Sequence, residues 1–86
     1  MCTNLTKTLD IQGSGKGAAG WFPVTQASVY FDHPQHAPAE HTLNIDFLSP
    51  ARGPSARVAV ELTAGSAREL AAAIEAALAA APPGLA

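Results

Sequence analysis

Apolar and polar residues alternate along four short segments, at residues 4–12, 24–32, 42–48 and 56–62. A period of two places successive side chains on opposite faces of a strand, so the alternation predicts four β-strands with one apolar face. The connections between neighbouring segments are short, which favours an antiparallel meander with that face buried.

A period of nearly four residues replaces the alternation near the C-terminus. Leu70, Ile74 and Leu78 recur among strong helix formers and predict an amphipathic helix. Ser66 and Glu69 have the spacing of a capping box, which predicts that the helix begins at Ser66.

Residues 82–84, Pro-Pro-Gly, end this helix, because proline lacks the backbone donor and clashes with the preceding turn. The apolar stripe of the helix is expected to cover the apolar face of the sheet. We therefore predict a single domain over residues 1–86 of the α+β class, a four-stranded antiparallel meander sheet with one C-terminal helix packed on one face, in the order ββββα.

The composition is that of a small globular protein, with 48% hydrophobic and 14% charged residues in 86. A chain of this size buries a limited fraction of its surface, and much of its apolar content is alanine. Association into a homo-oligomer would bury surface that a single chain leaves exposed, so we expect the protein to be a homo-oligomer.

The charge pattern argues against two classes of partner. The net charge is −2 and the five basic residues are scattered, so no basic patch for nucleic acid is expected. No apolar run reaches membrane-spanning length, and the N-terminus lacks a signal-peptide pattern. One cysteine cannot form an internal disulfide, and together these features predict a cytoplasmic protein.

All three histidines lie within residues 33–41, between the second and third predicted strands. His33 keeps the strand phase of Phe31, and His41 keeps that of Leu43, so both are expected on the apolar face at one end of the sheet. His36 lies in the loop between them and is expected to fold back over the same place.

Imidazole is the commonest metal ligand at neutral pH, so His33, His36 and His41 are candidate metal ligands. Histidines with a carboxylate or thiolate suit a divalent transition metal, either zinc, iron, copper or nickel. Glu40 and Cys2 are candidates for the remaining positions or for catalysis by proton transfer or nucleophilic attack. The spacing matches no standard metal signature, so a metal-free ligand site and a merely polar hairpin loop remain alternatives.

The glycine-rich segment 13–20 is predicted to be a flexible connection between the first two strands. Its glycine amides and Lys16 are compatible with anion or nucleotide binding, but the P-loop pattern is missing and no helix follows. The meander places this segment at the opposite end of the sheet from the histidines. A flexible or substrate-covering loop is therefore the favoured interpretation.

Three motifs carry a similarity that covers nearly the whole chain: the Met-Cys-Thr start, the Gly-Ser-Gly-Lys-Gly segment with the following Trp-Phe-Pro, and the Asp-His-Pro to Glu-His segment. Together they resemble a group of short actinobacterial proteins of unassigned function. The resemblance implies a bacterial setting and transfers no activity, cofactor or site residue.

These patterns lead to two functional hypotheses. The first is a small metal-binding protein whose site is built from the His33–His41 segment, with a metal-dependent enzyme as one form of it. The alternative is a non-enzymatic oligomeric binding or interaction module whose histidine loop contacts a partner or a small-molecule ligand.

Overall fold

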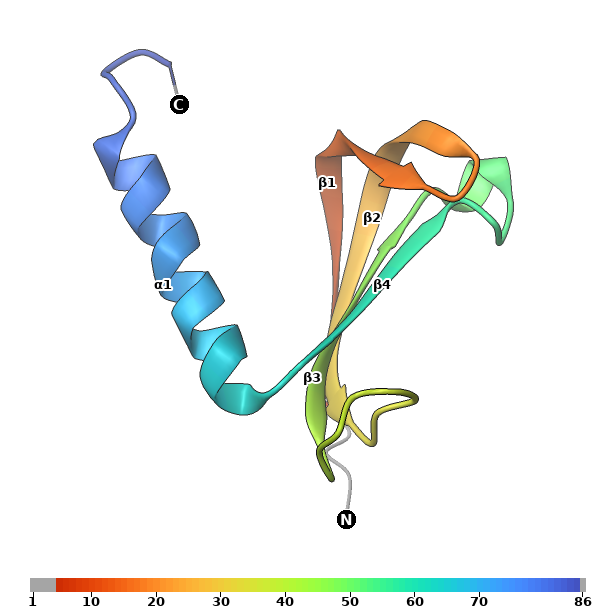
Figure 1. The fold of residues 1–86 in the computed structure, drawn as a ribbon. Helices are drawn as coiled ribbons and strands as arrows, with labels where there is room; N and C mark the ends of the chain where they lie inside the picture. The colour runs from red at the N-terminus through yellow and green to blue at the C-terminus, as the bar shows by residue number, and fades with distance from the viewer. Residues whose placement is uncertain (1–4, 86) are drawn as a thin grey trace.

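The computed structural model describes residues 5–85. Four antiparallel strands form one sheet in sequential order, followed by a single helix (Figure 1). The elements are β1 (Thr6–Gly17), β2 (Gly20–Asp32), β3 (Thr42–Leu48), a 3₁₀ turn (Pro50–Arg52), β4 (Arg57–Leu62) and α1 (Ala64–Ala80). The predicted α+β class and the order ββββα are confirmed.

The pairing of the strands separates an apolar from a polar face. Val29, Ile45 and Val60 lie side by side across β2, β3 and β4, because residues directly opposite one another share a face. One residue further along, the register aligns Tyr30 of β2 with Asn44 of β3 on the other face. Where β2, β3 and β4 are paired, the sheet therefore has an apolar side and a polar side, as the alternation predicts.

The glycine-rich segment differs from the prediction, because it is paired strand and not a flexible loop. β1 continues to Gly17, and Gly15 pairs with Phe22 of β2. A Cβ atom on Gly15 would lie 3.0 Å from Cγ2 of Val24 and 3.8 Å from Cγ2 of Val58 on β4. Glycine therefore lets the end of β1 curl over toward β4, and Gly20 closes the turn with a positive φ of 113°.

A β-bulge accompanies this curl. The pairing of β1 with β2 shifts register between Asp10 and Gly13. The buried Val24 and Ala27 are three positions apart in β2, which breaks the period of two at the same place. An extra residue in one strand bends that strand and increases its twist, so the bulge gives the sheet its curvature.

The helix begins earlier than predicted. Its N-cap is Thr63, whose Oγ1 accepts a hydrogen bond from the backbone N–H of Ser66 at 3.2 Å. The predicted cap at Ser66 is wrong, because Thr63 has the extended backbone and the hydroxyl that an N-cap requires. The C-terminal end matches the prediction, since the helix stops at Ala80 before the two prolines.

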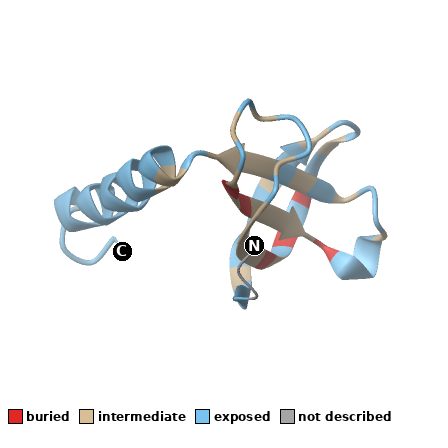
Figure 2. Ribbon diagram, turned by 90° about the horizontal axis from the view of Figure 1, so that it is seen from below, coloured by how far each residue is buried: buried red, intermediate tan, exposed pale blue. Residues whose placement is uncertain are grey.

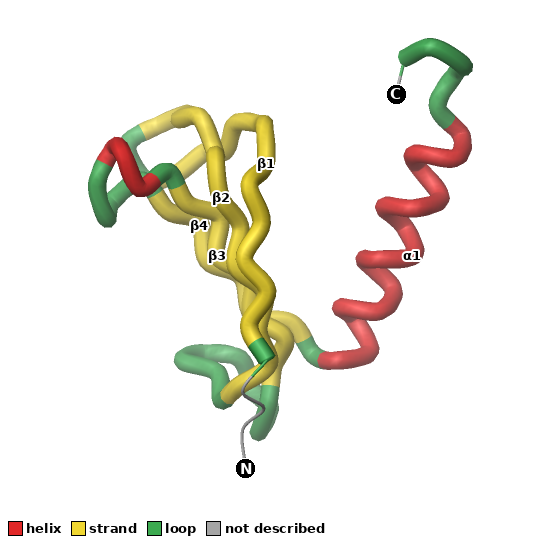
Figure 3. Tube along the Cα trace, turned by 180° about the vertical axis from the view of Figure 1, so that it is seen from behind, coloured by secondary structure: helices red, strands yellow, loops and turns green. Residues whose placement is uncertain are grey.

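The helix covers less of the sheet than the sequence suggests. It touches β3 and β4 at its beginning and then diverges from the sheet (Figures 1 and 3). The side chains of Leu70, Ile74 and Leu78 are 43%, 52% and 56% exposed. Only Thr63 separates β4 from α1, so the direction of the helix is set where the strand ends.

The core is correspondingly small. Among the described residues, the buried hydrophobic side chains are Phe22, Val24 and Ala27. All three belong to β2, and Phe22 and Val24 lie in its curled part, opposite Gly15 and Gly13 of β1. The helix contains no buried residue (Figure 2). The curl of the sheet therefore does more to form the core than the helix does.

Replacing Gly15 by alanine tests the curl. The added methyl would overpack against the buried Val24, so we expect a loss of about 1–3 kcal/mol in the free energy of unfolding. Gly13→Ala is the matched control, because nothing lies within 4 Å of its Cβ position; we expect its stability to change by less than about 1 kcal/mol. Urea denaturation measures both, and equal effects of the two variants would contradict the curl.

Candidate functional site

The loop between β2 and β3 folds back onto β4 and is tied there by one carboxylate. The backbone N–H groups of Gln35, His36 and Ala37 all donate to the side chain of Glu61. The bonds from His36 and Ala37 to Oε1 are each 2.9 Å long. We call this arrangement the Glu61 clamp.

The clamp satisfies backbone groups that the local sequence leaves without strand partners. Pro34 and Pro38 interrupt regular structure on either side of the three donors. The hydrogen bond from the Gln35 N–H, followed by those from Ala37 and His36, holds the pKa of Glu61 below its usual value against the opposing effect of burial. The ionised carboxylate is thus the form that binds the loop.

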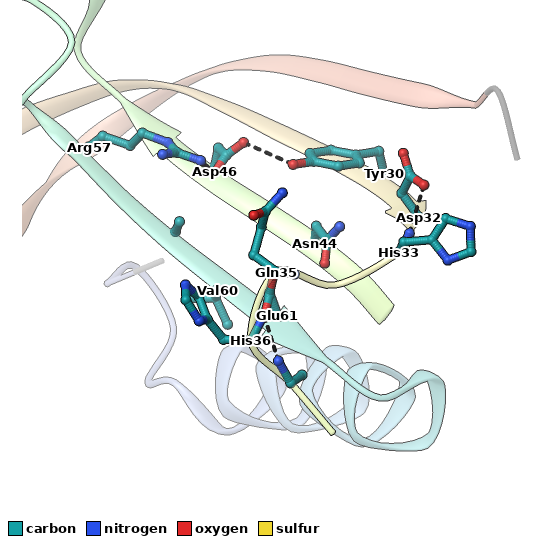
Figure 4. A pocket seen from close by; sticks show the side chains of 12 residues that line it. Tyr30, Asp32, His33, Gln35, His36, Asn44, Asp46, Arg57, Val60 and Glu61 are labelled. Atoms are coloured by element: carbon teal, nitrogen blue, oxygen red, sulfur yellow. Dashed lines mark hydrogen bonds and ion pairs between the residues drawn. The ribbon is translucent and has the colours of Figure 1, made fainter. Parts of the chain in front are cut away.

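A cleft of about 810 Å³ lies on the polar face between the strands and this loop (Figure 4). Side chains from β2, β3 and β4 form its floor, and the loop forms one wall. Its polar and charged lining consists of Tyr30, Asp32, His33, Gln35, His36, Asn44, Asp46, Arg57 and Glu61. Counting the described residues, the cleft holds three carboxylates and one guanidinium, an excess of negative charge when the histidines are neutral.

Asp46 is the centre of a short polar network in this cleft. Arg57 donates to its Oδ1 from Nη2 at 2.8 Å and from Nε at 3.2 Å. Tyr30 donates to its Oδ2 at 3.4 Å, and the two side chains face each other in Figure 4. Burial, and then the charge of Asp46, raise the pKa of Tyr30, so its hydroxyl stays protonated and able to donate.

Two of the predicted site histidines, His33 and His41, meet at this end of the sheet, although His33 also lines the polar cleft and is not confined to the apolar face. The ring centroids of His33 and His41 are 4.5 Å apart, and the ring of His41 stacks on Phe31 at 5.8 Å. His33 Nδ1 lies 3.1 Å from the carbonyl oxygen of Glu40. Within residues 5–85, Nε2 of His41 is the one buried side-chain nitrogen or oxygen atom that lacks a hydrogen-bond partner.

The third histidine does not join this pair. His36 lines the polar cleft, where Figure 4 places its ring beside Val60 and away from His33. Across the described part of the chain, no group of three or more His, Cys, Asp or Glu side chains has the geometry of a metal site. The expectation that His36 folds over the His33–His41 pair is wrong, because the Glu61 clamp holds its backbone against β4.

The remaining candidates have different positions. Glu40 is exposed, and its backbone carbonyl is the part that contacts His33. Asp32 accepts a hydrogen bond from the backbone N–H of His33 at 2.6 Å and lines the cleft. Cys2 lies outside the described residues.

Sequence reasoning missed Glu61 as a site residue. Its position on the outward face of the fourth strand is visible in the alternation, but so is that of many solvated polar residues. The same holds for Tyr30, Asp46 and Arg57, whose outward positions the alternation does not distinguish from those of solvated polar residues. Two signals were available: the meander brings the end of the fourth strand, with Glu61, to the same end of the sheet as the histidines, and the polar positions of three strands align on one face next to the histidine loop.

The chain matches a protein-family model over residues 1–86, and the description of that family is "Family of unknown function (DUF6295)". The chain therefore belongs to the family DUF6295. No curated protein and no solved structure matches it. Among residues 5–85, no helix has both the length and the apolar character needed to cross a membrane.

Glu61→Gln tests the clamp through its pH dependence. The pKa of Glu61 is lower in the folded than in the unfolded chain, so its contribution to stability is present above about pH 4.3 and is lost as the pH falls through the folded pKa. We expect the variant to show a shallower dependence of stability on pH in this acidic window. Urea denaturation between neutral and acidic pH measures it.

The same variant should expose the loop. Hydrogen exchange at the amides of Gln35, His36 and Ala37 should become faster, because a neutral amide oxygen is a weaker acceptor than a carboxylate. Glu75→Gln, on the exposed face of α1, is the control with the same change of charge. Unchanged exchange in the loop of Glu61→Gln would contradict the clamp.

Proposed function

We propose that the chain is a small binding module that holds a polar, positively charged ligand in the cleft under the 33–41 loop. The observation that supports this proposal best is the cleft itself, whose volume of about 810 Å³ is within the range of small-molecule sites. Its floor is a paired sheet, and the Glu61 clamp holds one wall. A site of this kind needs little reorganisation on binding, which favours affinity.

The charges in the cleft indicate the ligand class. Asp32, Asp46 and Glu61 outnumber the single cation, Arg57. Arg57 is already bound to Asp46, and the backbone donors of the loop offset much of the charge of Glu61. An ammonium or guanidinium group would be attracted by the remaining negative charge and by the ring face of Tyr30.

A second candidate function is the binding of a divalent transition metal, zinc, iron, copper or nickel, by His33 and His41. The contact of His33 Nδ1 with the Glu40 carbonyl would fix the proton on that nitrogen and free Nε2 for a metal. The buried Nε2 of His41, without a partner in the described part of the chain, would gain one. In this proposal Glu40 and Cys2 are the candidates for further ligands or for proton transfer, so the site would also allow a metal-dependent enzyme.

The setting that we propose is a bacterial cytoplasm, in line with the composition and the single cysteine. We also infer a homo-oligomer, because the apolar stripe of α1 is exposed in the single chain. Both functions are compatible with this state.

Titration of ¹⁵N-labelled protein with agmatine and spermidine, followed by NMR, tests the cleft. We expect saturable shifts at the backbone amides of Tyr30, Asn44 and Asp46, and none of comparable size with citrate. Asp46→Asn should weaken binding about tenfold, equivalent to about 1.4 kcal/mol, by removing a carboxylate. Asp10→Asn, on exposed β1, is the matched control and should bind normally. Equal binding of citrate, or no saturable shift, would reject the proposed ligand class.

Metal analysis of untagged protein loaded with zinc, copper or nickel tests the second candidate. We expect close to one metal per chain, its loss in the His33→Ala/His41→Ala double variant, and its retention in His36→Ala. Retention is expected because the ring of His36 is not part of the His33–His41 pair and lies away from His33 in Figure 4. The candidate is rejected if the protein takes up no stoichiometric metal, or if the double variant still does.

A further inference from the structure

An apolar groove lies between the beginning of α1 and the apolar face of the sheet, on the side away from the polar cleft. Its volume is about 350 Å³, and its lining includes Val29, Leu43 and Ile45 of the sheet and Leu70 and Ile74 of the helix. Arg68 is the only charged residue within the described range 5–85 that lines it. Beyond the groove, the helix and the sheet diverge further (Figures 1 and 3).

The helix itself has the composition of an interface element. Its charged residues are Arg68, Glu69 and Glu75, and most of the others are alanine, leucine or isoleucine. Every residue from Arg68 to Ala80 is exposed in the single chain. A surface helix of a monomer usually buries its apolar stripe, so this one lacks its packing partner.

The exposed area is large enough for a stable dimer. A compact folded monomer of 8.8 kDa has an accessible surface of about 4,800 Å². This chain exposes 6362 Å², about 1,600 Å² more. A standard interface removes about 800 Å² from each partner, so the excess exceeds what one interface requires.

The radius of gyration, like the accessible surface, is larger than that of a compact domain of this length. The radius of gyration is 14.4 Å, whereas a compact domain of this length has about 12 Å. The difference arises because α1 projects from the sheet instead of lying on it (Figure 1).

We infer that the occupant of the apolar groove is a second copy of this chain. The two copies form a symmetric dimer in which α1 of each copy lies against the apolar face of the other and against its helix. Such a pairing is isologous: each copy offers the same helix and receives the same helix, so the assembly closes at two chains. The interface leaves the polar cleft on the opposite face open, and it therefore does not depend on the proposed ligand.

The apolar face could also be covered if α1 folded onto its own sheet, but the short link between β4 and α1 opposes this. α1 could close onto its own sheet only by changing direction at Thr63, the single residue between β4 and α1. The Thr63 side chain binds both the N–H and the hydroxyl of Ser66, which fixes the first turn of the helix. A helix from another copy has no such constraint on its direction.

Light scattering coupled to gel filtration measures the oligomeric state. We expect the wild-type chain to have twice the mass of 8.8 kDa, and Leu70→Glu and Ile74→Glu to have the monomer mass while circular dichroism shows the helix intact. Leu85→Glu, the same kind of change on an exposed residue beyond the helix, is the matched control and should remain dimeric. A wild-type monomer at millimolar concentration overturns the inference.

A mixed-label experiment locates the interface. Unlabelled chain with a spin label on Leu78→Cys, in a Cys2→Ser background, is mixed with ¹⁵N-labelled wild-type protein. We expect the amide signals of Val29, Leu43 and Ile45 to broaden, because the helix of one copy lies over the sheet of the other. A dimer without this broadening, or with the broadening confined to the polar face, overturns the inference.

Discussion

The site depends on one carboxylate, that of Glu61, which accepts three consecutive backbone N–H groups from the loop between β2 and β3. Backbone donors in a loop must be satisfied when they lie against the protein, and a carboxylate is the strongest acceptor available in a side chain. The clamp decides that the loop lies over the polar face. It therefore forms one wall of the cleft and draws His36 away from the other two histidines.

The two faces of the sheet are used differently. The polar face is closed by the loop and contains a network centred on Asp46, whereas the apolar face is covered only where α1 begins. The buried hydrophobic side chains of the described chain, Phe22, Val24 and Ala27, all belong to β2 and none to the helix. The proposed ligand site and the proposed dimer interface therefore lie on opposite faces of the sheet, so that binding at one leaves the other open.

The alternation of the four segments predicted the order of strands, and with it the convergence of His33 and His41. That inference succeeds because side-chain direction in a strand follows from position alone. The extent of β1 was not predictable in the same way. Glycines at positions 13–17 resemble a flexible connection, and only the approach of Val24 and Val58 explains why the strand needs a residue without a Cβ at position 15.

The sequence by itself determined the ββββα order, the polar and apolar faces and the end of the helix, because each depends on the periodicity of side chains and on the missing donor of proline. The tertiary structure alone decided which groups meet across long sequence distances. The bonds from Gln35, His36 and Ala37 to Glu61 depend on the path of a loop through space. Local pattern contains no information about that path, and so the clamp, the cleft and the open apolar face became visible only in the folded chain.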